Sequence, residues 1–197
     1  YIRLENLLQG FSKPCLIDIK LGYRTYDEDA TTLKISQEIA KYFYQKTIGF
    51  RLSGMKIYDE ESESYQVFTR EWGRSIAPSK MRQELRRFFY PASREGRDEV
   101  LQNRLQQFID KLRELLEIFE QDNDKYRFYA SSILCVYEGD WNSESTLNKI
   151  ELRLIDFAHV FPIKDELESE RRDFNVIFGL KSVLNYIVEM TPGSSQQ

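Results

Sequence analysis

The order in which strand-like and helix-like segments follow one another is the feature of this sequence that most limits its fold. In some segments apolar residues recur at every second position, as in strands, and in others at every third or fourth, as in helices. Strands and helices do not alternate one by one, so the order is not that of a repeating βαβ protein. The sequence therefore predicts an α+β protein with one antiparallel sheet packed by helices.

The individual segments are separated by glycine, proline and polar turns. The predicted strands span Tyr1–Leu7, Cys15–Leu21, Gly49–Tyr58, Tyr65–Thr69, Phe128–Tyr137 and Ile150–Phe157. The predicted helices span Asp27–Lys46, Pro78–Phe89, Glu99–Gln121 and Asp173–Met190. We expect residues 1–190 to form one domain and residues 191–197 to be a disordered tail.

Composition narrows the possible functions. The net charge of the chain is −4, whereas a protein that coats nucleic acid is normally basic, so no nucleic-acid partner is expected. One histidine and two cysteines are too few for a zinc site. Cys15 and Cys135 lie in apolar segments, which indicates buried thiols in a reducing compartment, the cytoplasm or the nucleus. The apolar runs are too short to cross a bilayer, and we expect a monomer without a transmembrane segment.

The segment Pro14–Gly22 carries two charges inside an apolar strand. Asp18 and Lys20 are two positions apart, so both side chains emerge from the same face of the predicted strand. Their apolar neighbours place the two charges at the edge of a core. A functional pair of charges and a simple salt-bridged strand end fit this spacing equally well.

The segment Leu154–His159 places an aspartate at the end of an apolar strand. Several kinase-type folds present a carboxylate to magnesium from such a position, with an aromatic residue after it, as Asp156 has here. Magnesium prefers oxygen ligands, and a hydroxyl of the pair Ser131-Ser132 would supply a second one. Taken singly, Asp156 is more simply interpreted as a capping residue, the serines as the start of a strand, and His159 as an ordinary histidine.

In combination, these segments form a specific pattern. The series P-x-x-x-D-x-K-x-G at Pro14–Gly22, S-S-I-L at Ser131–Leu134 and I-D-F-A-H at Ile155–His159 resembles the inositol polyphosphate kinase family. Tyr137-Glu138-Gly139 and Phe178-Gly179-Leu180 extend this resemblance over nearly the whole chain. It implies phosphorylation of inositol phosphates by ATP with Mg²⁺, in a protein-kinase-like architecture of two lobes. This chain then corresponds to the large lobe, beginning at the hinge, with the N-terminal lobe largely absent from it.

The resemblance also implies roles for residues on the nucleotide side. Leu4-Glu5-Asn6-Leu7 is similar to the hinge of the multikinase branch of the family. The backbone carbonyl of Glu5 and the backbone N–H of Leu7 would therefore hold adenine. Asp18 would bind the ribose hydroxyls.

Four further residues are implied at the point of phosphate transfer. Asp156, together with Ser132, would hold Mg²⁺. Lys20 would lie between ATP and the inositol ring and contact the transferred phosphate. His159 would lie near the accepting hydroxyl, so Lys20, Asp156 and His159 are the expected catalytic residues.

The predicted helix Asp27–Lys46 carries polar side chains that suit a phosphorylated ring. Lys34, Gln37 and Lys41 are spaced i, i+3 and i+7 and share one face. Such spacing more commonly marks a solvated helix face, but the substrate-binding helix of the family has the same layout. The resemblance therefore implies that these three residues bind the inositol phosphate, together with Lys20, Arg70 and His159.

Some residues depart from the nearest branch of the family, the multikinases. Glu38 and Arg70 stand where that branch has glutamine, and both changes alter the charge offered to the substrate. Tyr126-Arg127-Phe128-Tyr129 is more similar to the hexakisphosphate kinase branch, which makes inositol pyrophosphates. An alternative from another functional class is a module that binds inositol phosphates without catalysis. A scaffold that uses the helix Glu99–Gln121 is a third, although its apolar stripe more simply predicts core packing.

Overall fold

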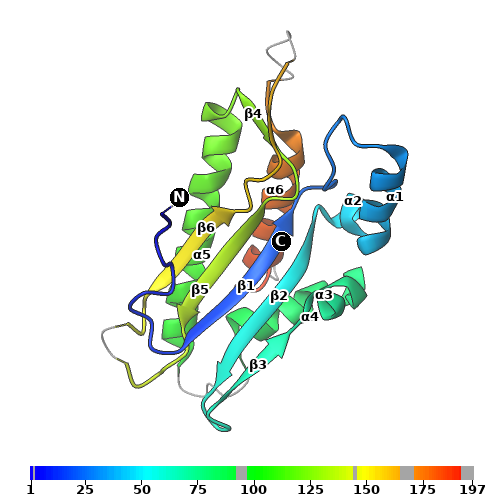
Figure 1. Ribbon diagram of the computed structural model, residues 1–197. Coiled ribbons are helices and arrows are strands. Elements are labelled where there is room, and N and C mark those ends of the chain that lie inside the picture. Colours follow the sequence, from blue (N-terminus) through cyan, green and yellow to red (C-terminus); the bar gives the residue numbers. More distant parts are fainter. Residues whose placement is uncertain (2, 92–96, 144–145, 165–170, 192–197) are drawn as a thin grey trace.

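A computed structural model describes residues 1, 3–91, 97–143, 146–164 and 171–191. In this part of the chain, a five-stranded antiparallel sheet has the order β3-β2-β1-β5-β6, and β4 pairs with β7 in a two-stranded sheet (Figure 1). The strands of the large sheet are β1 (Pro14–Leu21), β2 (Phe50–Asp59), β3 (Ser64–Phe68), β5 (Ser132–Glu138) and β6 (Ile150–Ile155). The small sheet consists of β4 (Tyr126–Phe128) and β7 (Val160–Pro162).

The helices fall into two groups around the large sheet. The described helices are α1 (Thr32–Lys41), α2 (Gln45–Ile48), α3 (Arg70–Ser75), α4 (Pro78–Phe89), α5 (Asp98–Glu117), the π-helical η1 (Ile118–Asp122) and α6 (Phe174–Val188). Figure 1 shows α5 and α6 behind the sheet, and α4 packs against α6 on the same side. The short helices α1, α2 and α3 lie beyond β2, at the side of the sheet. The predicted antiparallel sheet packed by helices is thereby confirmed.

Alternation along β1 divides the sheet into a core face and an open face. Cys15, Ile17, Ile19 and Leu21 are buried in the core, whereas the intervening side chains are only partly buried. Helices α4, α5 and α6 complete this core with Met81, Leu85, Phe88, Leu105, Phe108, Leu112, Val176, Leu180 and Val183. The residues between the core positions of β1, among them Asp18 and Lys20, therefore face the side of the sheet that these helices leave open.

The predicted strand Tyr1–Leu7 is wrong. None of the described residues in this segment belongs to a strand, and the chain turns at Asn6, whose carbonyl accepts a hydrogen bond from the N–H of Gln9. Leu4 is 83% exposed, so the alternation of this segment has no core to pack against. Residues 192–197 of the predicted tail lie outside the described residues.

The predicted helix Asp27–Lys46 is shorter and divided. Helix α1 begins only after Thr31, whose hydroxyl accepts a hydrogen bond from the N–H of Lys34, as an N-cap should. The backbone becomes extended at Tyr42, and α2 follows as a separate turn of helix. The buried Tyr42 hydroxyl donates to the carbonyl of Ile76, so a tertiary contact outweighs the local helical pattern here.

Two predicted strands also end earlier or begin later than expected. The segment Phe128–Tyr137 divides into β4 and β5 around Ala130, which has a φ of 54°. Strand β6 ends at Ile155 because Asp156 has a φ of 66°, a left-handed conformation that no regular strand contains. The short elements α3 and β7 were not predicted from the sequence, since α3 has one large apolar residue, Trp72, and β7 is three residues long, so neither shows a repeating apolar pattern.

Helix α3 approaches β2 closely at a glycine. A Cβ atom on Gly73 would lie 1.9 Å from the carbonyl oxygen of Leu52, which leaves no room for any side chain. The Gly73→Ala variant must displace α3 or strain β2, so we expect the free energy of unfolding to fall by about 1–3 kcal/mol. Urea unfolding measures this change.

Gly54 of β2 offers a matched control for this substitution. A Cβ atom there would lie 3.5 Å from the carbonyl oxygen of Phe68, an ordinary van der Waals distance. Gly54→Ala should therefore leave stability nearly unchanged. Equal losses in both variants would show that glycine itself, not the close approach of α3, explains the effect.

Candidate functional site

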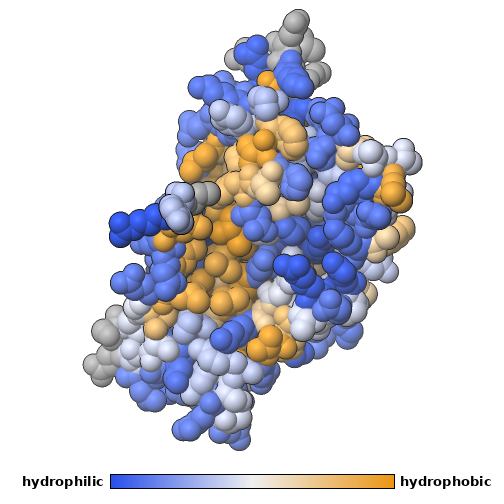
Figure 2. Space-filling model, viewed as in Figure 1, coloured by the Kyte–Doolittle hydropathy of each residue, from blue (hydrophilic) through white to orange (hydrophobic). Residues whose placement is uncertain are grey.

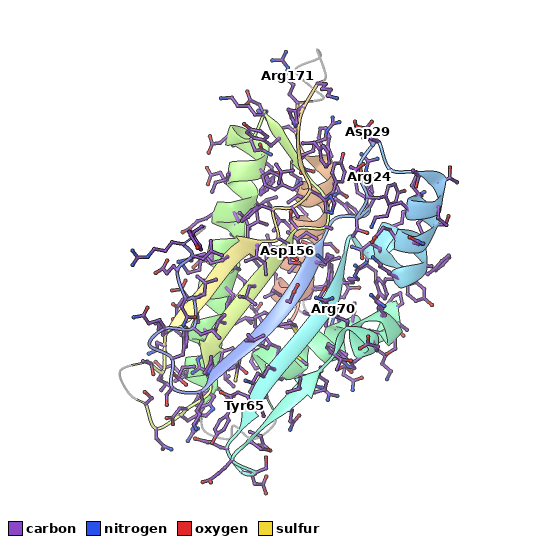
Figure 3. The ribbon with its side chains drawn as sticks, in the orientation of Figure 1. Arg24, Asp29, Tyr65, Arg70, Asp156 and Arg171 are labelled. Carbon is purple, nitrogen blue, oxygen red and sulfur yellow. The ribbon has the colours of Figure 1, made fainter. Side chains whose placement is uncertain are left out.

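The open face of the sheet ends in a charged cleft of about 270 Å³ between β1, β2 and the short helices α1 and α3. Its cations are Lys20, Lys34, Lys41, Arg51, Arg70 and Arg74. Its carboxylates are Asp18, Asp27, Glu38 and Asp156. Figure 2 shows a hydrophilic area beside an apolar area that lies over β5 and β6, and Figure 3 shows Asp156 and Arg70 on either side of β1.

Strand register brings Lys20 and Asp156 together. Lys20 lies opposite Ser132 on β5, and Ser132 lies opposite Ile155 on β6, directly before Asp156. The ammonium group of Lys20 donates to the carbonyl oxygen of Ala130 at 2.5 Å and lies 3.2 Å from Oδ2 of Asp156. The Lys20 side chain is 14% exposed and that of Asp156 is 53% exposed, so the lysine supports a carboxylate that stays open to the cleft.

Two residues in left-handed conformations shape this end of the sheet. Ala130 and Asp156 have φ values of 54° and 66°, which cost backbone energy in residues other than glycine. Side-chain and backbone hydrogen bonds hold them: Ser131 Oγ donates to the carbonyl of Asp156, and the N–H of Tyr129 donates to the carbonyl of His159. Strain of this kind collects at functional sites, and here it turns Asp156 toward β1.

Asp18 is a carboxylate with incomplete compensation. Burial raises its pKa, and nearby Asp156 adds to the rise, while the Ser132 hydroxyl, Lys20 and Arg70 oppose it. Among the described residues, neither Oδ1 of Asp18 nor Oγ of Ser132 has a hydrogen bond of normal geometry, although both atoms are buried. Buried polar atoms without partners are rare in native proteins, so these two atoms are candidates for contact with a ligand.

A bulge in β2 brings Arg51 to the cleft. The register between β1 and β2 shifts after Asp18, so that Asp18 pairs with Gly54 but Lys20 pairs with Arg51. Phe50 and Leu52 thereby remain in the core and Arg51 faces the cleft. β-Bulges often occur next to active sites, where they redirect a side chain in this way.

The arginines of the cleft are available for an anion. Arg51 is only 7% exposed, and its guanidinium donates to the amide oxygen of Gln45 at 3.2 Å rather than to a carboxylate. Burial lowers the pKa of Arg51, and the like charges of Arg70 and Arg74 contribute to this. In the part of the chain that the structure describes, none of these three arginines forms an ion pair with a carboxylate. Such a group of guanidinium ions favours binding of phosphate groups.

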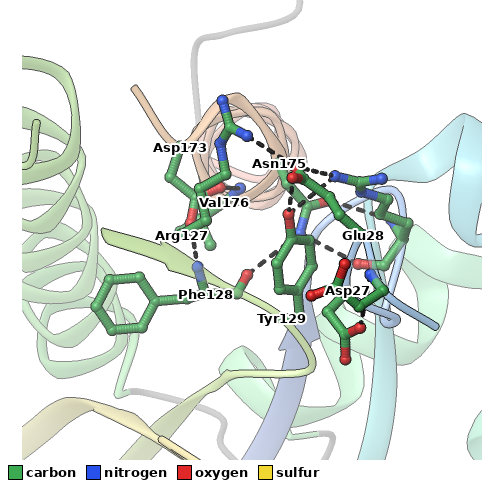
Figure 4. A network of polar contacts seen from close by, with 10 residues as sticks. Asp27, Glu28, Arg127, Phe128, Tyr129, Asp173, Asn175 and Val176 are labelled. Carbon is green, nitrogen blue, oxygen red and sulfur yellow. Dashed lines mark hydrogen bonds and ion pairs between the residues drawn. The ribbon is translucent and has the colours of Figure 1, made fainter. Parts of the chain in front are cut away.

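The segment that leads from β1 into α1 is held by a polar network (Figure 4). Oε1 of Glu28 accepts hydrogen bonds from Arg127 at 2.7 Å, from Tyr129 at 3.2 Å and from Arg24 at 3.3 Å. The side chain of Asn175 bridges the N–H and the carbonyl of Arg24. Although burial would raise the pKa of Glu28, Arg127, Tyr129 and Arg24 lower it, so the carboxylate stays ionised. The network fixes the start of the connection that carries α1 over the cleft.

Most of the residues predicted from the sequence meet in this cleft. It is lined by seven of them: Asp18, Lys20, Lys34, Lys41, Arg70, Asp156 and His159. Ser132 lies directly beneath, between Lys20 and Ile155. Gln37 is exposed on α1 and does not line the cleft, and neither do Glu5 and Leu7, which precede β1. The described residues contain no cluster of three or more histidine, cysteine or carboxylate side chains suited to a metal ion.

Arg51 and Arg74 were missed by the sequence analysis. The apolar positions Phe50, Leu52 and Met55 change spacing from two to three, which is a sequence signal of the bulge that turns Arg51 into the cleft. Arg74 follows Arg70 by four positions, but this spacing has meaning only once the unpredicted helix α3 is known.

Comparison with known proteins agrees with this geometry. Residues 1–188 match the family described as inositol polyphosphate kinase. The chain belongs to the inositol polyphosphate kinase family. As for membranes, no helix in the described residues of this family member is long and apolar enough to span one.

Several members of the inositol polyphosphate kinase family are similar to the chain. The human inositol polyphosphate multikinase is 34% identical over 197 residues, which cover 99% of this chain and 45% of the relative. The mouse inositol hexakisphosphate kinase 3 is 28% identical over 98% of this chain and 51% of the relative. A crystal structure of the inositol phosphate multikinase of S. cerevisiae with ADP and Mn²⁺ has a TM-score of 0.77 and 28% identity, covering 94% of this chain and 82% of that one. The chain spans about half the length of the curated relatives it matches.

The raised pKa of Asp18 predicts that the charge of this carboxylate lowers the stability of the fold. Asp18→Asn removes a buried charge, so we expect the free energy of unfolding at pH 7 to rise by about 1 kcal/mol. Below the unfolded-state pKa of aspartate, about 3.9, the carboxyl group is protonated in both states and the gain should vanish. The gain should grow as the pH rises through the higher folded-state pKa. Urea unfolding at a series of pH values measures this dependence.

Asp122→Asn is the control, because Asp122 is exposed in η1 and distant from the cleft in sequence and in the fold. It should change stability by less than about 0.5 kcal/mol at every pH. A lower stability of Asp18→Asn than of the parent protein at pH 7 would contradict this prediction. It would mean that the attraction of the surrounding cations for the Asp18 carboxylate exceeds the cost of burying its charge.

Proposed function

We propose that this cleft transfers the γ-phosphoryl group of ATP to a hydroxyl of an inositol phosphate. The observation that carries the proposal is the meeting of Asp18 and Asp156 with six cations in one cleft. Carboxylates suit the nucleotide and its metal, and converging cations suit a ring that carries several phosphate groups. Membership of the inositol polyphosphate kinase family supports both the nucleotide and the inositol phosphate as ligands of this cleft.

On the nucleotide side, Asp18 is the proposed acceptor for the ribose hydroxyls. Its buried Oδ1 atom has no hydrogen bond of normal geometry within the described residues, so a donating hydroxyl would satisfy it. We propose that the carbonyl of Glu5 and the N–H of Leu7 hold adenine, as the hinge motif of the family implies. The crystal structure of the S. cerevisiae relative, described with ADP and Mn²⁺, supports a nucleotide and a divalent metal in this family.

The donor atoms near Asp156 fit a magnesium site. Asp156 supplies an exposed carboxylate, and Ser132 supplies a buried hydroxyl whose oxygen has no hydrogen bond of normal geometry within the described residues, both of them hard oxygen donors. Magnesium is commonly held by one or two protein ligands and the substrate phosphates, so two donors suffice. When bound, the ion neutralises charge on the phosphate oxygens.

Positioning and charge stabilisation are the tasks of the remaining residues. The ammonium group of Lys20, fixed by Ala130 and Asp156, lies between the nucleotide side and the cations of the cleft and would stabilise charge on the transferred phosphoryl group. His159 lines the cleft and would contact the attacking hydroxyl. Lys34, Lys41, Arg51, Arg70 and Arg74 would hold the phosphates of the acceptor, and Gln37 would join them only if its side chain turned toward the ring.

The branch of the family leaves two substrate classes open. Multikinase-like phosphorylation of ring hydroxyls is the function we propose, in line with 34% identity to the human multikinase. Pyrophosphate formation, as in the hexakisphosphate kinases, is the alternative, in line with 28% identity to the mouse enzyme.

We also propose a location in the cytoplasm or the nucleus. The two cysteines are free and buried, which supports a reducing compartment.

The experiment that tests this function is an assay of the complete protein with Mg-ATP and a panel of inositol phosphates, followed by identification of the products.

We expect Lys20→Ala to lower turnover by about 10²–10³-fold, the usual effect of losing one well-placed stabilising group. Asp156→Asn should raise the metal concentration needed for half-maximal rate. Lys80→Ala on the exposed face of α4 should leave turnover unchanged.

Intact turnover in Lys20→Ala would remove this residue from the mechanism. If the parent protein formed no phosphorylated product from any member of the panel, the kinase assignment itself would fail.

A second candidate is an inositol-phosphate-binding module without catalysis. One observation favours it. The cations that would bind an inositol phosphate line the cleft, whereas Glu5 and Leu7, the residues proposed to hold adenine, lie outside it. Calorimetry with Mg-ATP distinguishes the two functions, because a pure binding module should release no heat of nucleotide binding.

A further inference from the structure

The one side chain that helix α1 buries fully is a carboxylate. Of its residues, all of which the structure describes, only Glu38 is buried, with 6% exposure. Of its apolar side chains, Leu33 and Ile39 are 69% and 49% exposed, and Ile35 is partly buried. A fully buried carboxylate is rare unless it is paired, so its partners indicate what this helix is for.

The two oxygens of Glu38 have different partners. Oε1 lies 3.1 Å from the ammonium nitrogen of Lys34 and 2.5 Å from that of Lys41. Oε2 accepts a hydrogen bond from the hydroxyl of Thr25, on the segment between β1 and α1, at 3.0 Å. Burial by itself would raise the pKa of Glu38, but hydrogen bonds from Lys41, Lys34 and Thr25 lower it to about 2. Glu38 is therefore ionised at any physiological pH.

A carboxylate in this position has two opposite effects on an anionic ligand. By sharing one oxygen, Lys34 and Lys41 are held side by side despite their like charges, and each retains further N–H donors for a phosphate. At the same time, the negative charge of Glu38 cancels part of the attraction of these lysines and of nearby Arg51. The repulsion between Glu38 and the ligand grows with every additional phosphate group on the ligand. The alignment of Lys34 and Lys41 by Glu38 does not depend on the number of phosphate groups.

We propose that Glu38 is a specificity-determining residue of the cleft, which positions Lys34 and Lys41 and restrains the binding of the most highly phosphorylated inositol rings. This inference rests on the proposed function and specifies its substrate class: inositol phosphates with fewer phosphate groups than the lysines and arginines alone would select. A built-in repulsive group is a common source of specificity.

The test compares inositol tris-, tetrakis- and hexakisphosphate as acceptors, with kcat and KM measured separately. Glu38→Gln keeps the shape of the side chain and its oxygen for Thr25 but removes the charge. We expect it to raise kcat/KM for the hexakisphosphate relative to the trisphosphate by about tenfold, mainly through KM. Calorimetric binding of the same three compounds should show the same change in ratio.

Two variants separate the charge of Glu38 from other effects. Glu38→Asp retains the charge and should retain the ratio of the parent protein. Glu114→Gln removes an exposed carboxylate from α5, behind the sheet, and should change nothing. A ratio unchanged in Glu38→Gln, or altered equally in Glu38→Asp, overturns the proposal.

A further variant covers the case in which Glu38→Gln does not fold, as judged by circular dichroism. Lys41→Met leaves Glu38 less compensated and should shift the ratio toward the trisphosphate, and an unchanged ratio would overturn the proposal. If the parent protein bound the panel without turnover, the proposed function would fail while the binding ratios still tested Glu38. If it bound no member of the panel, both would fail.

Discussion

The register of β1 between β2 and β5 is the constraint on which the whole cleft depends. Ile17 and Ile19 have no exposed surface, while Asp18 and Lys20 alternate with them on the open face. Burying an aliphatic side chain contributes about 1.5–3 kcal/mol, so a slip of one residue would lose this contribution and drive both charges into the core. The core thus fixes the position of the charges, and the charges in turn gain their partners from the neighbouring strands. Lys20 reaches Asp156 only because Ser132 stands between them in the same register.

The sequence was most informative where local pattern and tertiary structure agree. Helix α4 has the predicted bounds because Pro78 begins it and its apolar stripe reaches the core. Alternation placed Asp18 and Lys20 on one face of a strand, and the apolar run before Asp156 placed it at a strand end, but only the resemblance to a family gave these residues roles. The cleft itself required the resemblance to a family, since no spacing in the sequence relates β1 to Asp156 across more than a hundred residues.

Other features depended on tertiary contacts that a single sequence does not display. Arg51 faces the cleft because of a bulge, and the bulge is visible only when β2 pairs with β1. The segment before β1 alternates like a strand but has no partner in the described sheet. Gln37 shares the spacing of Lys34 and Lys41, yet the side chain that α1 buries is Glu38, whose role follows from its contacts and not from its periodicity.

The exposed apolar side of α1 has a consequence for the dynamics of the protein. A helix whose one fully buried side chain is a carboxylate should open locally at a lower free energy than the strands of the sheet. A ligand that bridges Lys34 and Lys41 to Lys20 of β1 would bind only the closed arrangement and would therefore stabilise it by mass action. Occupancy of the cleft and the local stability of α1 are then thermodynamically linked, so the helix would report the presence of substrate through the protection of its own backbone amides.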